Sequence, residues 1–270
     1  MSAINLDLDD YFERIQWRGE IRPSLAALSG LLQAHMAHIP FENFDVLLGR
    51  PVSLDIASVQ GKLVGARRGG YCFEQVTLFA AVLEALGFAP ARHTARVVRF
   101  VPPDQAPRTH MFLTVPLAEG TFVVDPGLGG FAPSVPVPLT EGAVARAGDE
   151  RHWMVHQGAH WMLRARLADE DINLWLSSVE ADNLVDFELG NHYTATHPQS
   201  IFRQRLMLRA LTQDGRITVM NRDVTLWRGR QAQTSQLADR HALRTLVQHY
   251  LGFDLPEIEQ LRIPGIPEWT

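Results

Sequence analysis

The sequence predicts an α+β protein built from three consecutive zones. Apolar residues recur every three to four positions through the first third of the chain, an alternation with a period of two begins near residue 90, and one last apolar helix precedes Gly252. The 270 residues, 46% of them hydrophobic, are enough for a sizeable core. Because no internal repeat or low-complexity segment occurs, we expect one compact unit.

Three helices are predicted in the first zone. Pro23 suits a first helical position, and an apolar face continues from there until Ile39-Pro40 ends the helix. Ser53 is typical of the N-cap of a second helix, which we expect to end at the surface near Lys62. The third helix runs over 72–86, and Gly87 is placed to terminate it.

Short strands separated by Pro, Gly and Asp follow. The first is predicted over 92–99, and further candidates cover 111–115, 121–124, 152–156, 161–167 and 173–179. Such a succession indicates a small barrel or sandwich. After a polar stretch at 190–200, the last zone combines strands over 206–211, 217–220 and 224–227 with a helix over 237–251.

Composition excludes several classes of protein. The formal net charge of -5 gives no basic field for nucleic acid or anionic lipid, and no apolar run is long enough to span a membrane. The acidic N-terminus is unlike a signal peptide, so we expect a cytoplasmic protein. The single cysteine precludes an intramolecular disulfide, and Lys62, the only lysine, lacks the surroundings of a phosphate-binding loop.

The single thiol, Cys72, follows two flexible glycines at a predicted helix start. Free backbone N–H groups and the positive end of the helix dipole favour the thiolate there, and Arg67 and Arg68 are near in sequence. A lone cysteine is more often a small buried apolar side chain. A nucleophilic role needs a base and a group that orients the base.

His110 and Asp125 are candidates for those two roles. His110 precedes one predicted strand and Asp125 follows the next, so adjacent strands can present them side by side. The ordinary alternatives are a surface histidine and an Asp-Pro-Gly turn. The glycines at 127, 129 and 130 either allow close approach to a ligand or form a tight turn. His152, His156 and His160 are spaced as metal ligands on a helix, but their surroundings indicate strands, so we expect no metal site.

Taken together, these residues resemble the arylamine N-acetyltransferases, in the family's order from about residue 39 to 228. The matching segments are Ile39-Pro40-Phe41-Glu42-Asn43, Arg68-Gly69-Gly70-Tyr71-Cys72-Phe73-Glu74-Gln75, Thr109-His110-Met111, Asp125-Pro126-Gly127-Leu128-Gly129-Gly130, Val185-Asp186-Phe187-Glu188 and Tyr193-Thr194-Ala195-Thr196-His197-Pro198. The chain departs from the family at Val76, where Asn is usual, and at Pro126 and Leu128, where Val and Phe are usual.

The resemblance implies a fold and a set of roles. The parts would be an N-terminal helical bundle (1–88), a middle β-barrel (89–195) and a C-terminal α/β lid (196–270), with a Cys-His-Asp triad as in cysteine-protease-like folds. The implied roles are Cys72 as nucleophile, His110 as base, Asp125 as orienting carboxylate, Glu42 and Arg68 as a structural pair, Phe41 and Phe202 as the amine pocket, and Thr109, Gly127, Gly129 and Gly130 along the coenzyme A path.

The implied activity is acetyl transfer from acetyl-CoA to arylamines, hydrazines or arylhydroxylamines through a Cys72 thioester, in a monomer or homodimer without a metal. Three alternatives stay open from the residues alone. They are an amide synthase of the same family that closes a macrolactam from a carrier-bound polyketide, a cysteine hydrolase or transglutaminase-like enzyme, and a binding module with a degenerate site.

Overall fold

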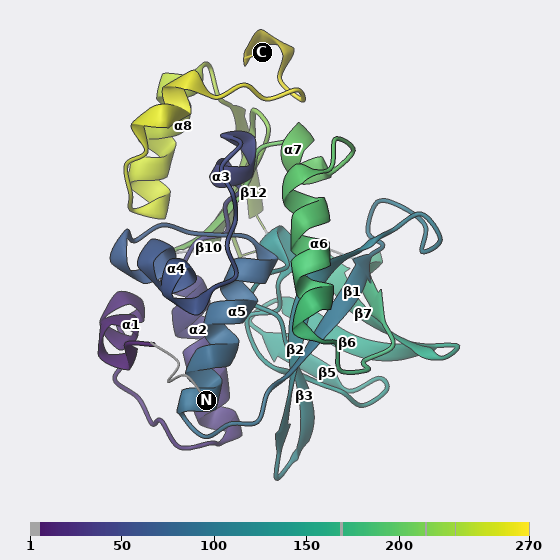
Figure 1. The fold of residues 1–270 in the computed structure, drawn as a ribbon. Helices are drawn as coiled ribbons and strands as arrows, with labels where there is room; N and C mark the ends of the chain where they lie inside the picture. Colours follow the sequence, from purple (N-terminus) through teal and green to yellow (C-terminus); the bar gives the residue numbers. More distant parts are fainter. Residues whose placement is uncertain (1–5, 168–169, 214, 230, 270) are drawn as a thin grey trace.

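The computed structural model describes residues 6–167, 170–213, 215–229 and 231–269, so the first five residues of the acidic N-terminus lie outside it. Helices form the N-terminal part, an eight-stranded sheet follows, and a four-stranded sheet with further helices completes the chain (Figure 1). The prediction of an α+β fold is confirmed. None of the described helices is both long and apolar enough to cross a bilayer.

The N-terminal part contains α1 (Leu8–Ile15), α2 (Leu25–His38), α3 (Phe44–Leu47), α4 (Ile56–Gln60) with a π-helical turn (Gly61–Gly65), and α5 (Cys72–Ala85). The prediction of Pro23 at the first helical position is wrong, because Ser24 caps α2 and Leu25 begins it. Gly87 follows α5 with φ of +84°, as its position predicts. The prediction of Ser53 as an N-cap is wrong. Asp55 caps α4, and the Ser53 hydroxyl accepts a hydrogen bond from the Asp55 N–H instead.

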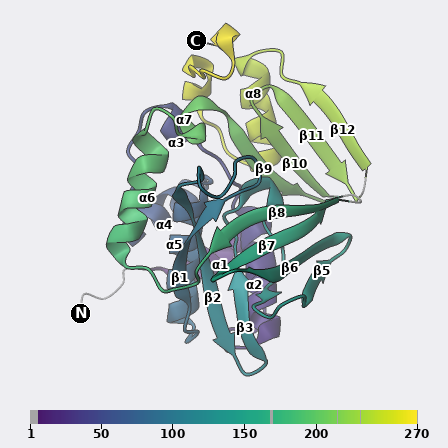
Figure 2. The ribbon, with the colours of Figure 1, turned by 90° about the vertical axis from the view of Figure 1, so that its right-hand side faces the viewer.

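The middle part is a nearly closed antiparallel barrel (Figure 2). Its strands are β1 (Ala91–Val97), β2 (Arg108–Leu117), β3 (Gly120–Val124), β4 (Val137–Pro138), β5 (Val144–Ala147), β6 (Glu150–Gln157), β7 (His160–Leu167) and β8 (Glu170–Ser177). Their order is β4-β3-β2-β1-β8-β7-β6-β5, and the edge strands β4 and β5 contact each other. Phe112 stacks on Trp175 inside the barrel.

α6 (Leu184–Thr196), which the sequence analysis does not predict, covers most of the polar stretch at 190–200, and α7 (Ile201–Gln204) follows. The face of α6 that packs on the protein carries Phe187 together with the small or polar residues Gly190, Asn191 and Thr194, while Leu184, Val185 and Leu189 are exposed. Because apolar residues lie on both the packed and the exposed face, the sequence shows no clear helical period here. The predicted boundary at 195 falls inside α6.

The last part is a four-stranded antiparallel sheet of β9 (Met207–Thr212), β10 (Gly215–Met220), β11 (Asp223–Arg228) and β12 (Gln231–Gln236), followed by α8 (Arg240–Leu246) and a π-helical turn (Val247–Leu251). One face of the sheet, with Leu208 and Ala210, packs in the C-terminal core. On the other face, Met207 and Leu211 pack against the core that contains Cys72. The sheet therefore borders the region around the thiol.

Candidate active site

Cys72 is the first residue of α5 and is 2% exposed. Glu74 completes a capping box, because its Oε2 accepts a hydrogen bond from the Tyr71 N–H at 3.1 Å. The Cys72 Sγ lies 3.7 Å from the carbonyl oxygen of Thr109, to which it donates a hydrogen bond. The fold thus places the thiol at the positive end of a 14-residue helix, beside the first residues of β2.

The backbone at Gly127 packs directly on the cysteine. A Cβ atom at this position would lie 2.6 Å from the Cys72 Cα and 2.9 Å from its Cβ. Only glycine fits there, because any side chain would displace the residue that carries the thiol. The Asp-Pro-Gly segment therefore serves as a wall for Cys72 and not only as a turn.

Two neighbouring strands bring His110 and Asp125 together. His110 lies on β2, Asp125 follows β3 directly, and their side chains are 2% and 0% exposed. The His110 Nε2 lies 2.8 Å from the Asp125 Oδ2. Since Nε2 is occupied in this way, Nδ1 is the ring nitrogen left for the thiol.

Asp125 accepts two further hydrogen bonds. The Trp175 Nε1–H donates to Oδ2 at 2.9 Å, and the Gly127 N–H donates to Oδ1 at 3.2 Å. Both oxygens of this buried carboxylate thus have donors within the protein. The place of Trp175 beside Asp125 could not be predicted from local sequence, because it depends on the pairing of β1 with β8 across the barrel.

The charges of the site favour a protonated histidine. Burial alone would lower the pKa of His110, but the charge and hydrogen bond of Asp125, with a smaller contribution from Cys72, raise the pKa to about 10. At neutral pH the arrangement can therefore hold an imidazolium between a carboxylate and a sulfur. Such a site can stabilise a thiolate and move a proton to or from it.

Aromatic residues and glycines surround Cys72 on the side of the four-stranded sheet. The rings of Phe41 and Phe202 are 6.3 Å apart, and Phe202 also contacts the ring of Tyr71, the residue before Cys72, at 5.3 Å. A Cβ atom at Gly129 would lie 3.6 Å from the Phe41 ring, and one at Gly130 would lie 3.4 Å from the Thr218 Cγ2. The structure thus brings these predicted residues together near the thiol.

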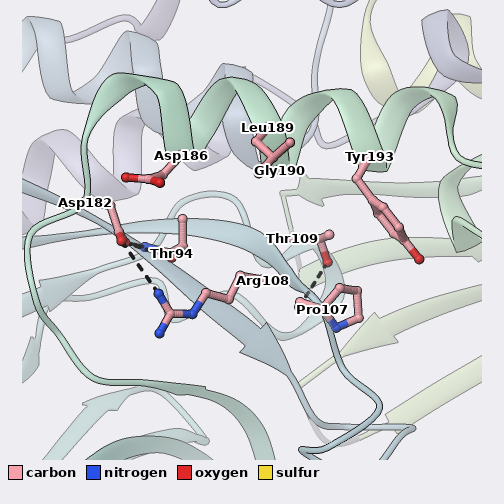
Figure 3. A pocket seen from close by; sticks show the side chains of 9 residues that line it. All are labelled: Thr94, Pro107, Arg108, Thr109, Asp182, Asp186, Leu189, Gly190 and Tyr193. Carbon is pink, nitrogen blue, oxygen red and sulfur yellow. Dashed lines mark hydrogen bonds and ion pairs between the residues drawn. The ribbon is translucent and has the colours of Figure 1, made fainter.

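A pocket of about 240 Å³ opens beside Thr109 (Figure 3). Residues 189, 190 and 193 of α6 form one wall, and residues 107–109 at the start of β2 form the opposite one. Gly190 allows this close packing, because a Cβ atom there would lie 3.1 Å from the carbonyl oxygen of Arg108. Thr109 therefore borders both this pocket and Cys72.

Behind α5 lies a buried set of five charged side chains, which we call the charged network: Glu42, Asp45, Lys62, Arg68 and Glu74. The predicted pair is present, since the Arg68 Nη2 and Nε lie 2.6 and 2.9 Å from the Glu42 Oε1. The prediction of Lys62 at the surface is wrong. Its side chain is 17% exposed, and its Nζ lies 2.6 Å from Asp45 and 2.7 Å from Glu74.

The network fixes the segment that carries the thiol. Burial lowers the pKa of Lys62, but the charges of three carboxylates outweigh burial and raise it above its usual value. Lys62 therefore stays cationic and holds Glu74, which in turn caps the helix at Tyr71.

Comparison with known proteins places this chain in a family. A family model described as N-acetyltransferase matches residues 24–260. An arylamine N-acetyltransferase of Mycobacterium tuberculosis is 36% identical over 258 residues, which cover 94% of this chain and 91% of that protein. The chain belongs to the arylamine N-acetyltransferase family.

This member of the arylamine N-acetyltransferase family is therefore an acyltransferase. A Salmonella typhimurium protein named arylamine N-acetyltransferase / N-hydroxyarylamine O-acetyltransferase is 31% identical over 254 residues, covering 93% of this chain and 90% of that protein. The solved structure of the Mycobacterium marinum arylamine N-acetyltransferase in complex with CoA has a TM-score of 0.89 and 33% identity, covering 93% and 94% of the two chains.

In this N-acetyltransferase the three histidines weighed as metal ligands lie on a β-hairpin. His152 and His156 belong to β6 and His160 to β7, and the His152 Nε2 lies 3.2 Å from the carbonyl oxygen of Phe131. Within the described ranges, no group of three or more His, Cys, Asp and Glu side chains is placed to hold a metal ion.

Proposed function

We propose that the protein transfers an acetyl group from acetyl-CoA to an arylamine, hydrazine or arylhydroxylamine, with Cys72 as the covalent carrier. The observation that carries the proposal is that His110 of β2 lies between Asp125 and Cys72, the first residue of α5. The relative solved with CoA and the relative named for an N-hydroxyarylamine activity support the donor and the acceptor class.

In the first half-reaction, the Cys72 thiolate attacks the carbonyl carbon of acetyl-CoA. The tetrahedral intermediate collapses with cleavage of the carbon–sulfur bond to CoA, and the CoA sulfur leaves with the proton from His110. One thioester replaces another, so little free energy is lost in the acyl-enzyme. Asp125 holds the imidazolium in place before the proton leaves it.

In the second half-reaction, the acceptor nitrogen attacks the Cys72 thioester. His110 takes the proton from the nitrogen, the carbon–sulfur bond breaks, and the amide leaves while the Cys72 thiolate and the imidazolium are restored. Aromatic amines are weak bases that stay neutral at pH 7 and keep a nucleophilic electron pair. Phe41 and Phe202 supply an aromatic wall for such rings.

The coenzyme approaches along residues 109 and 127–130, of which Thr109 and Gly127 lie against Cys72. A single free thiol is compatible with a reducing compartment, and we expect the protein to act in the cytoplasm.

Intact-mass measurement tests the proposal. Wild-type protein incubated briefly with acetyl-CoA and no amine should gain one acetyl group, and Cys72→Ala should gain none. The adduct should disappear when an aromatic amine is added. An adduct lost equally fast in buffer alone would instead indicate a hydrolase, and absence of an adduct on a thiol that iodoacetamide alkylates readily would refute acetyl-CoA as donor.

A further inference from the structure

Two arginines of the four-stranded sheet lie on the face that borders the Cys72 region. Arg209 of β9 is paired with Thr218 of β10, and Arg216 is two residues before Thr218, so both arginines share a face. The opposite face carries Ala210 and Ile217, which pack in the C-terminal core. We call Arg209 and Arg216 the arginine pair.

The arginine pair has too little negative charge around it. Arg209 is 4% exposed, and its Nε has no hydrogen-bond partner among the described residues. The Nε of Arg216 is also buried without a partner in the described part of the chain, and the Nη1 of Arg216 lies 2.7 Å from Glu150. Burial, together with the charge of Arg216, lowers the pKa of Arg209 to about 10 in spite of Glu150.

This imbalance has a physical meaning. A buried cation without a counter-charge costs several kcal/mol, so proteins rarely keep one unless an anion arrives from outside. Two guanidinium groups share one carboxylate here, and the Glu150 side chain is 30% exposed. The arginine pair and Glu150 together are therefore accessible to solvent at Glu150 and carry one uncompensated positive charge.

The arginine pair adjoins the proposed path of the coenzyme. Gly130 lies beside Thr218, and Gly127, whose backbone packs on Cys72, is three residues away, a span of at most about 11 Å. The backbone of Arg209 also forms two hydrogen bonds with that of Phe41, at 2.8 and 2.9 Å. Cys72 and Thr218, the strand partner of Arg209, thus border the 127–130 segment at its two ends.

We propose that Arg209 and Arg216 bind phosphate groups of CoA, an inference that rests on the proposed function. The planar guanidinium fork matches two phosphate oxygens, and burial strengthens these charge-assisted hydrogen bonds. In CoA a flexible pantetheine arm separates the thiol from the phosphates. A phosphate site set apart from Cys72 along the glycine segment suits that length of arm.

Calorimetric binding of CoA and of pantetheine, which has no phosphate, tests the site on the full-length protein. Arg216→Gln and Arg209→Gln should each weaken CoA binding about tenfold. Pantetheine binding should not change. Glu150→Gln should tighten CoA binding, because it removes a carboxylate that competes with phosphate for Arg216.

Arg228→Gln is the matched control. Arg228 is exposed on β11, on the face opposite the arginine pair, so the substitution removes the same charge from the same sheet and should leave CoA binding unchanged. Arg209→Met tests whether Arg209 stabilises the fold. If its charge is uncompensated, the unliganded variant should have a melting temperature no lower than that of wild type. If Arg209 has a purely structural role, the melting temperature should fall.

The outcomes separate this proposal from the proposed function. If Arg216→Gln and Arg209→Gln bind CoA as wild type does, or lose CoA and pantetheine binding equally, the phosphate site is refuted even when acetyl-CoA still acetylates Cys72. If only CoA binding weakens but Cys72 is never acetylated, the phosphate site stands and the acetyltransferase proposal fails. If inorganic phosphate binds the wild type as tightly as CoA does, the pair serves free phosphate and the proposal is wrong.

Discussion

The charged network behind Cys72 and the arginine pair on the four-stranded sheet are both largely shielded from solvent, with no side chain more than 17% exposed, but only the first is compensated within the chain. Lys62 and Arg68 each have two carboxylate partners, whereas Arg209 and Arg216 have one between them. The difference indicates what each set is for. Groups that must hold a geometry are paired inside the protein, and groups that must meet a ligand keep donors unpaired.

Asp125 belongs with the compensated groups, because His110, Trp175 and Gly127 occupy both of its oxygens. Substitutions among the compensated groups should therefore impair chemistry or stability. Substitutions in the arginine pair should impair affinity alone. The following experiments test that division.

The largest effect is expected for Asp125→Asn. Loss of the carboxylate removes the charge that stabilises the His110 imidazolium, and the rate of Cys72 acetylation should fall about a thousandfold. Rapid-quench mass spectrometry measures that rate. Asp171→Asn, at an exposed ion pair on β8, should leave it unchanged, and a loss of less than tenfold in Asp125→Asn would contradict the role of Asp125.

The charge state of His110 gives a second test of the same group. Its pKa near 10 lies above the ordinary 6.5, so the stabilisation from its charge is complete below pH 6.5 and is lost as the pH rises through 10. Urea unfolding should show the free energy of unfolding falling over this interval. In Asp125→Asn burial remains without the carboxylate, so NMR titration should give a pKa below 6.5, and an unchanged pKa would refute the assignment.

Removal of the cation from the charged network should reduce stability. Burial raises the pKa of Glu74 to about 7 even with Lys62 beside it, and Lys62→Met leaves Glu74 and Asp45 with less compensation. We expect a loss of about 3 kcal/mol in the free energy of unfolding. Arg244 also pairs with two carboxylates, but at the surface. Arg244→Met should therefore lower the free energy of unfolding far less than Lys62→Met does. Equal losses would contradict the role of burial.

The smallest effect is expected for Trp175→Phe, which removes one donor to Asp125 and keeps an aromatic ring against Phe112. The rate constant for acetylation should fall about tenfold at saturating acetyl-CoA, with an unchanged KM. Trp161→Phe, where the ring contacts His156, is the control. A rise in KM without a change in rate would indicate that Trp175 does not act through Asp125.

The sequence predicted those parts of the molecule that depend on local signals. The helix that begins at Cys72, the glycines that end helices at 87 and 252, and most strands follow from spacing and turn residues. The candidate residues at 72, 110 and 125 were visible because each lies at the end of a predicted element. Their closeness in space agrees with that prediction.

Features that depend on distant partners were not predictable. Lys62 was placed at the surface because its carboxylate partners are 12 and 17 positions away. The helix α6 was missed because several of its apolar residues lie on the exposed face. No local sequence pattern indicates the positions of Trp175 and Arg209. Their positions depend on strand pairing across the barrel and on which face of the last sheet is buried.

One single-turnover experiment tests the division between compensated and uncompensated groups most directly. Acetylation of Cys72 is measured with acetyl-CoA below saturation and with the acetyl thioester of N-acetylcysteamine, which lacks phosphates, in Asp125→Asn and Arg216→Gln. This division predicts that Asp125→Asn is acetylated slowly with both donors, and that Arg216→Gln is acetylated slowly with acetyl-CoA alone. Equal slowing of Arg216→Gln with both donors would contradict it.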